Sequence, residues 1–267
     1  MLSVSRSGYY RWLQRATSQR ARERQQLVAE IRRIHAANRA IYGSPRVADA
    51  LKALGISCGK NRVARLMRSH GIRSRIKRKF KVTTHSRHQR PVTEDLLQQD
   101  FTASAPHTKW SSDITSIWTK EGWLYLAVFL DLFTRRIVGW SMSHRMTDEL
   151  VVDAFQSAWQ KHRPSAGLVV HSDRGSQYCS KAFRQRLIQY GCRQSMCAAG
   201  NCFDNAITES FFHSLKTEWV YHETYADRSE ARRSIFTYIE MFYNRVRIHS
   251  ALGGLSPEQF ESRAQVA

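Results

Sequence analysis

From residue 110 onward the chain alternates between apolar runs rich in β-branched and aromatic residues and amphipathic runs of helical period. Short breaks separate the first β-rich runs, "KWSSDITSIWT", "GWLYLAVFLDLF" and "RRIVGWSMS", as in a meander. A helical run (147–162), the apolar run "GLVVHSD", a second helical run (180–191), a strand-like run near "QSMC" and a long helical region follow. This order predicts a mixed five-stranded sheet flanked by helices, an α/β layer architecture.

The first 72 residues show helical periodicity and predict a small all-α domain. Leu27, Ile31 and Ile34 lie at helical spacing. In the following segment Ser44 is the predicted N-cap and Pro45 the first helical residue of a short helix. A turn over residues 55–59 leads into a second helix, so the pattern indicates a helix-turn-helix.

The second of these helices predicts a basic outer face. Its apolar residues, Val63, Leu66 and Met67, form an inward stripe. The outward positions are Lys60, Asn61, Arg62, Arg65 and Arg68. Such a face suits a DNA duplex, but a solvated face on an ordinary helical hairpin is an equal alternative.

Charge is distributed unevenly. The formal net charge is +20, and residues 1–99 hold 23 Lys and Arg against 5 Asp and Glu, whereas residues 100–267 hold 19 against 17. A basic third of this kind favours a polyanionic partner, most plausibly nucleic acid. Between the helical domain and the sheet, residues 73–104 read as a basic linker whose Lys77, Arg78 and Lys79 are expected to follow a phosphate backbone.

The five cysteines and the apolar runs bear on the compartment. The cysteines follow no signal peptide, and no apolar run approaches the length of a membrane span, so we expect a reducing, cytoplasmic setting without membrane contact. Cys192, Cys197 and Cys202 suggest zinc, but their intervals are not the short pairs of zinc sites, and separate thiols are the better interpretation.

Three carboxylates stand at positions that the fold should bring together. Asp113 lies inside the first strand, Asp173 follows the end of a later strand, and Glu209 lies in the first turns of the last core helix. Ligands collect where strands of an open α/β sheet end. Three acids in one cleft repel one another unless a hard divalent cation neutralises them, so we expect Mg²⁺, as two ions with Mn²⁺ as a substitute. A chance grouping among 22 acids is the alternative.

Four motifs carry a resemblance to a known family. The segments "WSSDITSIWTKEGWLYLAVFLDLFTRRIVGWSMS", "VVHSDRGSQYCS", "GNCFDNAITESFFHSLKTE" and "YNRVRIHSALGGLSPEQF" resemble the B-frame transposases of the frameshifting bacterial insertion sequences, relatives of retroviral integrases. The resemblance covers nearly the whole chain. It implies an RNase H-like core at 105–222 after the helical domain (1–72) and the linker (73–104), with a helical extension at 223–267.

The resemblance also implies an activity and a site. Asp113, Asp173 and Glu209 match the metal-binding triad of a DDE recombinase, in which water cleaves one strand at an element end and the freed 3′ hydroxyl attacks another phosphodiester. Implied partners are double-stranded DNA of the terminal repeats and the target, a second copy of the chain at least, and an A-frame protein. The implied place of action is the bacterial cytoplasm, at the nucleoid.

Several residues around the triad could have either of two roles. His213 and Lys216 share a helical face with Glu209 and either contact DNA or are merely solvated. His171 and Gln177 either orient the metal ligand or make structural hydrogen bonds. We expect a turn and cap that position the catalytic helix, formed by Gly200, Asn201, Asp204 and Asn205. Core positions are expected for Phe211, Phe212, Leu215 and Trp219.

Two other functions compete with strand transfer. The first is a DNA-binding regulator whose catalytic domain is silent and serves assembly, although an intact triad argues against decay. The second is a general RNase H-like nuclease acting on RNA–DNA hybrids, although a basic helix-turn-helix favours duplex DNA.

Overall fold

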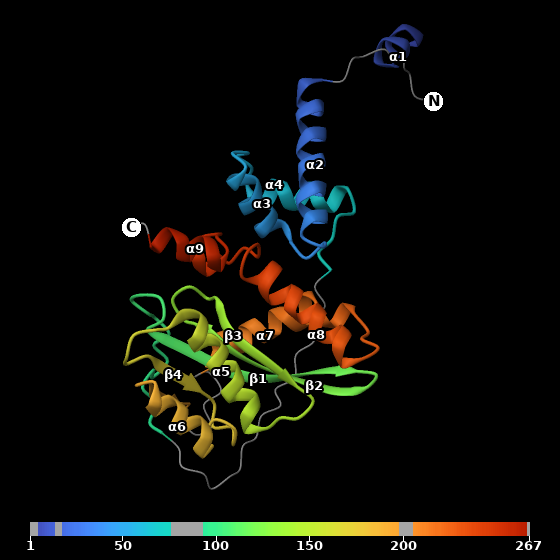
Figure 1. The fold of residues 1–267 in the computed structure, drawn as a ribbon. Coiled ribbons are helices and arrows are strands. Elements are labelled where there is room, and N and C mark those ends of the chain that lie inside the picture. Colours follow the sequence, from blue (N-terminus) through green and yellow to red (C-terminus); the bar gives the residue numbers. More distant parts are fainter. Residues whose placement is uncertain (1–4, 14–17, 76–92, 198–204, 266–267) are drawn as a thin grey trace. The chain divides into compact units, whose positions relative to one another are not determined.

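The computed structural model describes residues 5–13, 18–75, 93–197 and 205–265 and divides into two compact units, Met1–Arg75 and Ile76–Ala267 (Figure 1). Each unit has its own apolar core. No helix in the described ranges is long and apolar enough to cross a bilayer. The predicted linker contacts Lys77, Arg78 and Lys79 lie outside the described residues.

The first unit is helical, as predicted. Its helices are α1 (Arg6–Leu13), α2 (Gln19–Ala37), α3 (Ser44–Ala53) and α4 (Lys60–Ser69). Apolar side chains of α2, α3 and α4 form its core, among them Ile31, Val47, Leu51 and Val63. Gly55, in the turn between α3 and α4, has φ +78°, a conformation that glycine adopts without steric cost. The helix-turn-helix expectation therefore holds.

One capping prediction is wrong. Gly43, not Ser44, is the N-cap of α3, and no side chain caps the helix. Ser44 is its first residue and Pro45 its second. Proline is tolerated throughout the first turn because the N–H groups there have no intrahelical partner, so the sequence left a one-residue ambiguity.

The second unit contains the predicted mixed five-stranded sheet. Its strands are β1 (Lys109–Thr119), β2 (Gly122–Asp131), β3 (Ile137–Ser143), β4 (Val169–Ser172) and β5 (Arg193–Met196), in the order β3-β2-β1-β4-β5. The first three strands form the antiparallel meander, and β4 and β5 add in parallel through helical crossovers. β1 is thus central, with an antiparallel neighbour on one side and a parallel one on the other.

Helices cover both faces of this sheet (Figure 1). They are α5 (Asp148–His162), α6 (Lys181–Gln189), α7 (Ala206–Glu218), η2 (Val220–His222), α8 (Arg228–Phe236), η3 (Thr237–Tyr243), η4 (Ser250–Leu252) and α9 (Pro257–Ala264). α5 packs on β2 and β3, close enough that a Cβ at Gly139 would lie 2.5 Å from Cβ of Ala158. α7 packs on β1, and α8 on β1 and β2.

The position of α7 is fixed by a buried ion pair. Glu218, 2% exposed at the end of α7, accepts two hydrogen bonds of 2.8 Å from Arg247, which is 5% exposed. Arg247 also donates to the hydroxyl of Ser214 (2.9 Å), and the Tyr238 hydroxyl donates to Glu218 (3.2 Å). Burial disfavours the charge on Arg247, but the hydrogen bonds that it donates to Glu218 outweigh this effect and raise the pKa of the guanidinium. The segment after η3 therefore holds α7 by charge-assisted bonds.

Candidate active site

Asp113 and Asp173 occupy equivalent positions on two neighbouring parallel strands. The ladder between β1 and β4 ends with the pair Ser112 and Ser172, and each aspartate is the next residue of its chain. Parallel register places such residues side by side at the carboxyl end of β4. Each carboxylate accepts one nearby backbone N–H, from Ile114 to Asp113 (2.7 Å) and from Gly175 to Asp173 (2.9 Å).

A buried tyrosine joins β1 to the loop after β4. The hydroxyl groups of Ser112 and Tyr178 share a hydrogen bond of 2.8 Å, and both residues are buried. Burial, followed by the charges of Asp113 and Asp173, raises the pKa of Tyr178 well above its ordinary value, so the phenol is neutral. This link fixes the position of the Asp173 loop relative to the strand that carries Asp113.

A second buried network joins β1 to the first turn of α7, which carries Glu209. The Ser111 hydroxyl donates to Oδ1 of Asn205 (2.6 Å), and the Thr208 hydroxyl donates to Oγ of Ser111 (2.7 Å). Nδ2 of Asn205 donates to the carbonyl of Ser112 (3.2 Å). α7, which bears Glu209, is therefore anchored to β1 at Ser111 and Ser112, the two residues before Asp113.

The expected cap residues are only partly described. Asn205 is the N-cap of α7, but its side chain makes no capping bond, because it is committed to the strand. Gly200, Asn201 and Asp204 lie outside the described residues. The positioning role predicted for Asn205 is thus served by a contact with β1 rather than by a helix cap.

Sequence reasoning missed Ser111, Thr208 and Tyr178 as positioning residues. The available signal was the pair of serines directly before Asp113, between Trp110 and Ile114. Buried hydroxyls need hydrogen-bond partners, and here the partners come from segments more than 60 positions away.

The three carboxylates interact electrostatically. Burial, then the charge of Asp173, raises the pKa of Asp113 well above its ordinary value, and Glu209 adds to the effect. Desolvation and the charge of Asp173 also raise the pKa of Glu209, although that side chain is exposed as a whole. The mutual repulsion connects all three residues. A group of acids that destabilise one another's charges favours a bound cation.

Lys216 and His213 lie on the same helix as Glu209. Lys216 is half-buried, and burial lowers its pKa while the charge of Asp113 opposes that shift. Its ammonium group therefore belongs to the electrostatic field of the triad. His213 is exposed. Contact of either side chain with DNA stays a prediction.

His171 and Gln177 contact protein groups. His171 is fully buried, with Nδ1 2.8 Å from Oγ of Ser195 and Nε2 3.4 Å from Sγ of Cys197. Nε2 of Gln177 donates to the carbonyl of Met146 (3.0 Å). These contacts favour the structural alternative for both residues. The residues expected in the core, Phe211, Phe212, Leu215 and Trp219, are buried.

The predicted basic face of α4 is formed. Val63, Leu66 and Met67 are buried, and the five outward residues from Lys60 to Arg68 are exposed. The helix thus presents cations and one amide to solvent, although exposure alone leaves duplex contact untested.

Family models match most of the chain. A model described as "HTH-like domain" matches residues 22–80, and two described as "Integrase core domain" match residues 103–202 and 209–264. "Transposase InsF for insertion sequence IS3A" of Escherichia coli (strain K12) is 47% identical over 98% of this chain and 92% of its own length. The chain belongs to the IS3 family of transposases. The resemblance inferred from the four motifs is confirmed.

Other comparisons agree with membership in the IS3 family. The "Insertion element IS600 uncharacterized 31 kDa protein" of Shigella sonnei is 45% identical over 98% of this chain and 97% of its own length. A chain of the simian T-cell lymphotropic virus intasome, solved with PP2A regulatory subunit B56 gamma, matches 86% of this chain and 73% of its own length at TM-score 0.50 and 16% identity. The predicted RNase H-like integrase fold is confirmed. This IS3-family chain is a DNA-binding transposase, a polynucleotidyl transferase of the DDE class.

A second cluster of potential ligands in the transposase lies at the edge formed by α5 and α9. Donor atoms of His107, His162 and Glu261 lie within 4.8 Å of one another. However, Nδ1 of His107 accepts from Nε1 of Trp110 (3.3 Å), which leaves the proton of the neutral ring on Nε2, facing Glu261 at 3.6 Å.

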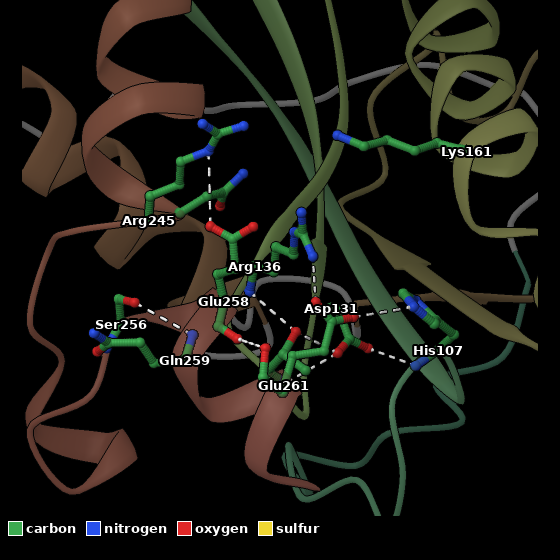
Figure 2. A network of polar contacts seen from close by, with 12 residues as sticks. His107, Asp131, Arg136, Lys161, Arg245, Ser256, Glu258, Gln259 and Glu261 are labelled. Carbon is green, nitrogen blue, oxygen red and sulfur yellow. Dashed lines mark hydrogen bonds and ion pairs between the residues drawn. The ribbon is translucent and has the colours of Figure 1, made fainter. Parts of the chain in front are cut away.

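A metal ion is not the best interpretation of this cluster. Figure 2 shows Arg136 and His107 approaching Glu261 of α9, and the guanidinium of Arg136 binds the Glu261 carboxylate directly. A bound cation would face this arginine, and His107 would have to lose its Nε2 proton. We interpret the cluster as a set of polar contacts that holds α9 to the sheet.

The cluster of His107, His162 and Glu261 predicts that the protein loses stability in acid. Burial, then the charge of His107, lowers the pKa of His162 from 6.5 to about 4, and its Nε2 has no hydrogen-bond partner. A histidine whose folded pKa is depressed contributes stability above pH 6.5 that is lost as the pH falls toward 4. Between pH 7 and pH 4.5 we expect His162 to account for a loss of about 1–3 kcal/mol in the free energy of unfolding.

Urea unfolding of the wild type and His162→Gln at both pH values checks this expectation. The variant should lose less stability than the wild type over the interval. Equal losses in the two proteins would show that His162 titrates normally in the folded state. The His107 hydrogen bond and Arg136 lower the pKa of Glu261 to about 2, so its stabilising contribution is present above pH 4.5 and is lost mainly below that pH, outside the interval compared.

Proposed function

We propose that Asp113, Asp173 and Glu209 together hold divalent metal, as two Mg²⁺ ions with Mn²⁺ as a substitute, for DNA strand cleavage and joining at insertion-sequence ends. The observation that carries the proposal is the meeting of three carboxylates from β1, the end of β4 and α7: Asp113 and Asp173 follow a shared ladder pair, and the charge of Asp173 raises the pKa of both Asp113 and Glu209. Their oxygen ligands suit a hard cation.

The protein's own contribution is rigid placement of charge. Ions held there would activate the attacking oxygen, first of water and then of the 3′ hydroxyl, and stabilise the leaving oxygen. The serine networks of β1 fix Asp113 relative to the other two acids, so little reorganisation is needed during the reaction. Lys216 interacts electrostatically with Asp113, and in this proposal its ammonium group orients the reacting phosphodiester.

The first unit would supply most of the affinity for the terminal repeats. In this proposal the duplex is contacted by four cations of α4: Lys60, Arg62, Arg65 and Arg68. Residues 77–79 of the linker follow the phosphate backbone. His213 and Lys216 contact DNA beside the metals. Cutting and joining two element ends requires two active sites, so we propose a homodimer or larger assembly on DNA, with an A-frame protein as a possible partner. The substrate places the chain in the bacterial cytoplasm, at the nucleoid.

The α4 face yields a salt-dependent prediction. The double substitution Arg62→Ala and Arg65→Ala is expected to weaken binding to an end duplex about tenfold or more and to reduce the slope of log affinity against log salt by about 2, one unit for each lost phosphate contact. Fluorescence anisotropy between 50 and 200 mM salt measures both quantities. Arg33→Ala is the matched control, because that exposed arginine of α2 pairs with Glu30. An unchanged slope in the double variant would exclude α4 from the interface.

The ion requirement tests the proposed function. Labelled duplexes bearing the element's terminal repeats are incubated with the full chain in Mg²⁺, Mn²⁺, Ca²⁺ or chelator, and cleaved and joined strands are counted. Cleavage and joining in Mg²⁺ and Mn²⁺, with none under chelation, is expected. Cleavage that survives chelation would overturn the metal assignment.

A further inference from the structure

A groove lies beside the end of β1, at the β1–β2 turn. Pairing with β4 ends at Ser112, and within the described residues β1 continues to Thr119 with β2 as its ladder partner. Beside this stretch lies a cavity of about 440 Å³, lined by the hairpin end, by Lys216 of α7 and by the segment from η2 to Tyr225. This volume falls in the range of small-ligand sites, about 300–1,000 Å³.

The groove presents large aromatic side chains to solvent. Trp118 is 59% exposed, its cross-strand partner Trp123 47%, and Tyr221 39%. The two indoles meet edge to face, with ring centroids 4.9 Å apart. Most aromatic side chains of this unit are buried in its core. Three exposed rings around one cavity therefore need another explanation.

The aromatic platform is held rigidly. Arg228 of α8 donates to the Glu121 carboxylate (2.5 Å), to the Glu121 carbonyl (3.0 Å) and to the Trp123 carbonyl (3.0 Å). On the other wall, the backbone N–H of Lys120 donates to the carbonyl of Tyr225 (3.0 Å). The hairpin end is thus fixed on both sides, and a ligand bound there would not have to order it.

The groove is connected to the triad through one residue. Lys216 lines the cavity and also interacts electrostatically with Asp113. Lys120 adds a second, exposed cation, against Glu223 as the acid of the lining. A nucleotide whose phosphate lies near Lys216 would therefore have its base within the aromatic part of the same cavity.

We propose that this groove binds an unpaired nucleobase of the DNA strand next to the reacting phosphodiester, stacked on Trp118 and Trp123. The proposal rests on the strand-transfer function above and adds a ligand subsite to it. Stacking on indole accepts any base, since every base has a π face, and the neighbouring lysines match its phosphates. Terminal or distorted base pairs cost least to open, so such a base is available at an element end and in a deformed target.

A binding experiment isolates the base. All proteins carry Glu209→Gln, so that DNA is bound without being cut. Two end duplexes are compared, both with the last three pairs opened by mismatches; in one of them the unpaired strand is abasic at those positions. With both tryptophans present we expect the abasic DNA to bind about tenfold more weakly. With Trp118→Ala the two DNAs should bind equally, whereas Trp118→Phe should keep the discrimination.

Controls separate the outcomes. Phe236→Ala removes an exposed aromatic ring of α8 and should leave the tenfold ratio unchanged. Equal discrimination in Trp118→Ala and its parent would overturn the base-binding groove, as would a parent that binds both DNAs equally. A parent that binds neither DNA would instead contradict the proposed function. Loss of self-association without DNA in Trp118→Ala, with discrimination unchanged, would identify a contact between copies and also overturn the proposal.

A second DNA identifies the source of the base. A duplex of unrelated sequence with a central unpaired loop, intact or abasic, represents the target. Discrimination by Trp118 on end duplexes alone assigns the groove to the element end. Discrimination on both DNAs supports a groove that accepts any unpaired base near the reacting strand.

Discussion

Replacement of Asp113 by asparagine is expected to lower strand cleavage and joining by at least about 10³-fold, or roughly 4 kcal/mol of transition-state stabilisation, while binding to the ends changes little. Asparagine keeps the size of the side chain and removes the negative charge. The charges of both Asp173 and Glu209 act on the buried carboxylate of Asp113. Single-turnover cleavage and anisotropy binding, measured on one preparation, separate the two effects.

Asp153→Asn is the matched control for that loss, because Asp153 is an exposed acid on α5 outside the triad. It should cleave at the wild-type rate. The double variant of Asp113→Asn and Asp173→Asn should be scarcely slower than either single variant, since residues that act as one unit are not additive. Multiplied losses would mean that the two aspartates act independently.

The largest expected loss of stability follows from breaking the Glu218–Arg247 pair. Arg247→Met leaves a buried carboxylate without its cation, which should cost about 3–5 kcal/mol. For a unit of this size the melting temperature should fall by roughly 10 °C. Differential scanning calorimetry of the full chain measures the shift in the transition of the second unit.

Two further variants test the cause. Glu218→Gln combined with Arg247→Met removes both charges and should recover most of the lost stability. Glu121→Gln breaks a more exposed ion pair, with Arg228, and should change stability by less than about 1 kcal/mol. An Arg247→Met protein as stable as Glu121→Gln would show that the buried pair does not hold α7.

The sheet and the triad could be predicted because their signals are local. Runs rich in β-branched and aromatic residues, separated by short breaks, identify β1 to β3, and each aspartate stands inside or just after a strand. The four motifs occur in the order that the family has, and this connected the local signals. The strand order β3-β2-β1-β4-β5 was not predicted, because it depends on the pairing of β1 with β4, which are distant in the sequence.

The supports of the triad could not be predicted, because they depend on contacts distant in sequence. Ser111 bonds Asn205 across 94 positions, and no periodicity distinguishes it from a solvated serine. Asn205 reads as a helix cap, and only the packing of α7 on β1 shows its other use. The exposure of Trp118 and Trp123 likewise contradicts the ordinary expectation that tryptophan lies in the core.

The most direct test is to compare the wild type with Glu209→Gln on a labelled duplex bearing the element's terminal repeat, in Mg²⁺, and to count nicked and joined strands. We predict that the wild type cuts and joins while Glu209→Gln binds equally well and does neither. A variant that cuts and joins at the wild-type rate would contradict the assignment of the third carboxylate. A wild type that binds the duplex but leaves it uncut, alone and when fused to the A-frame segment, would instead indicate a regulator.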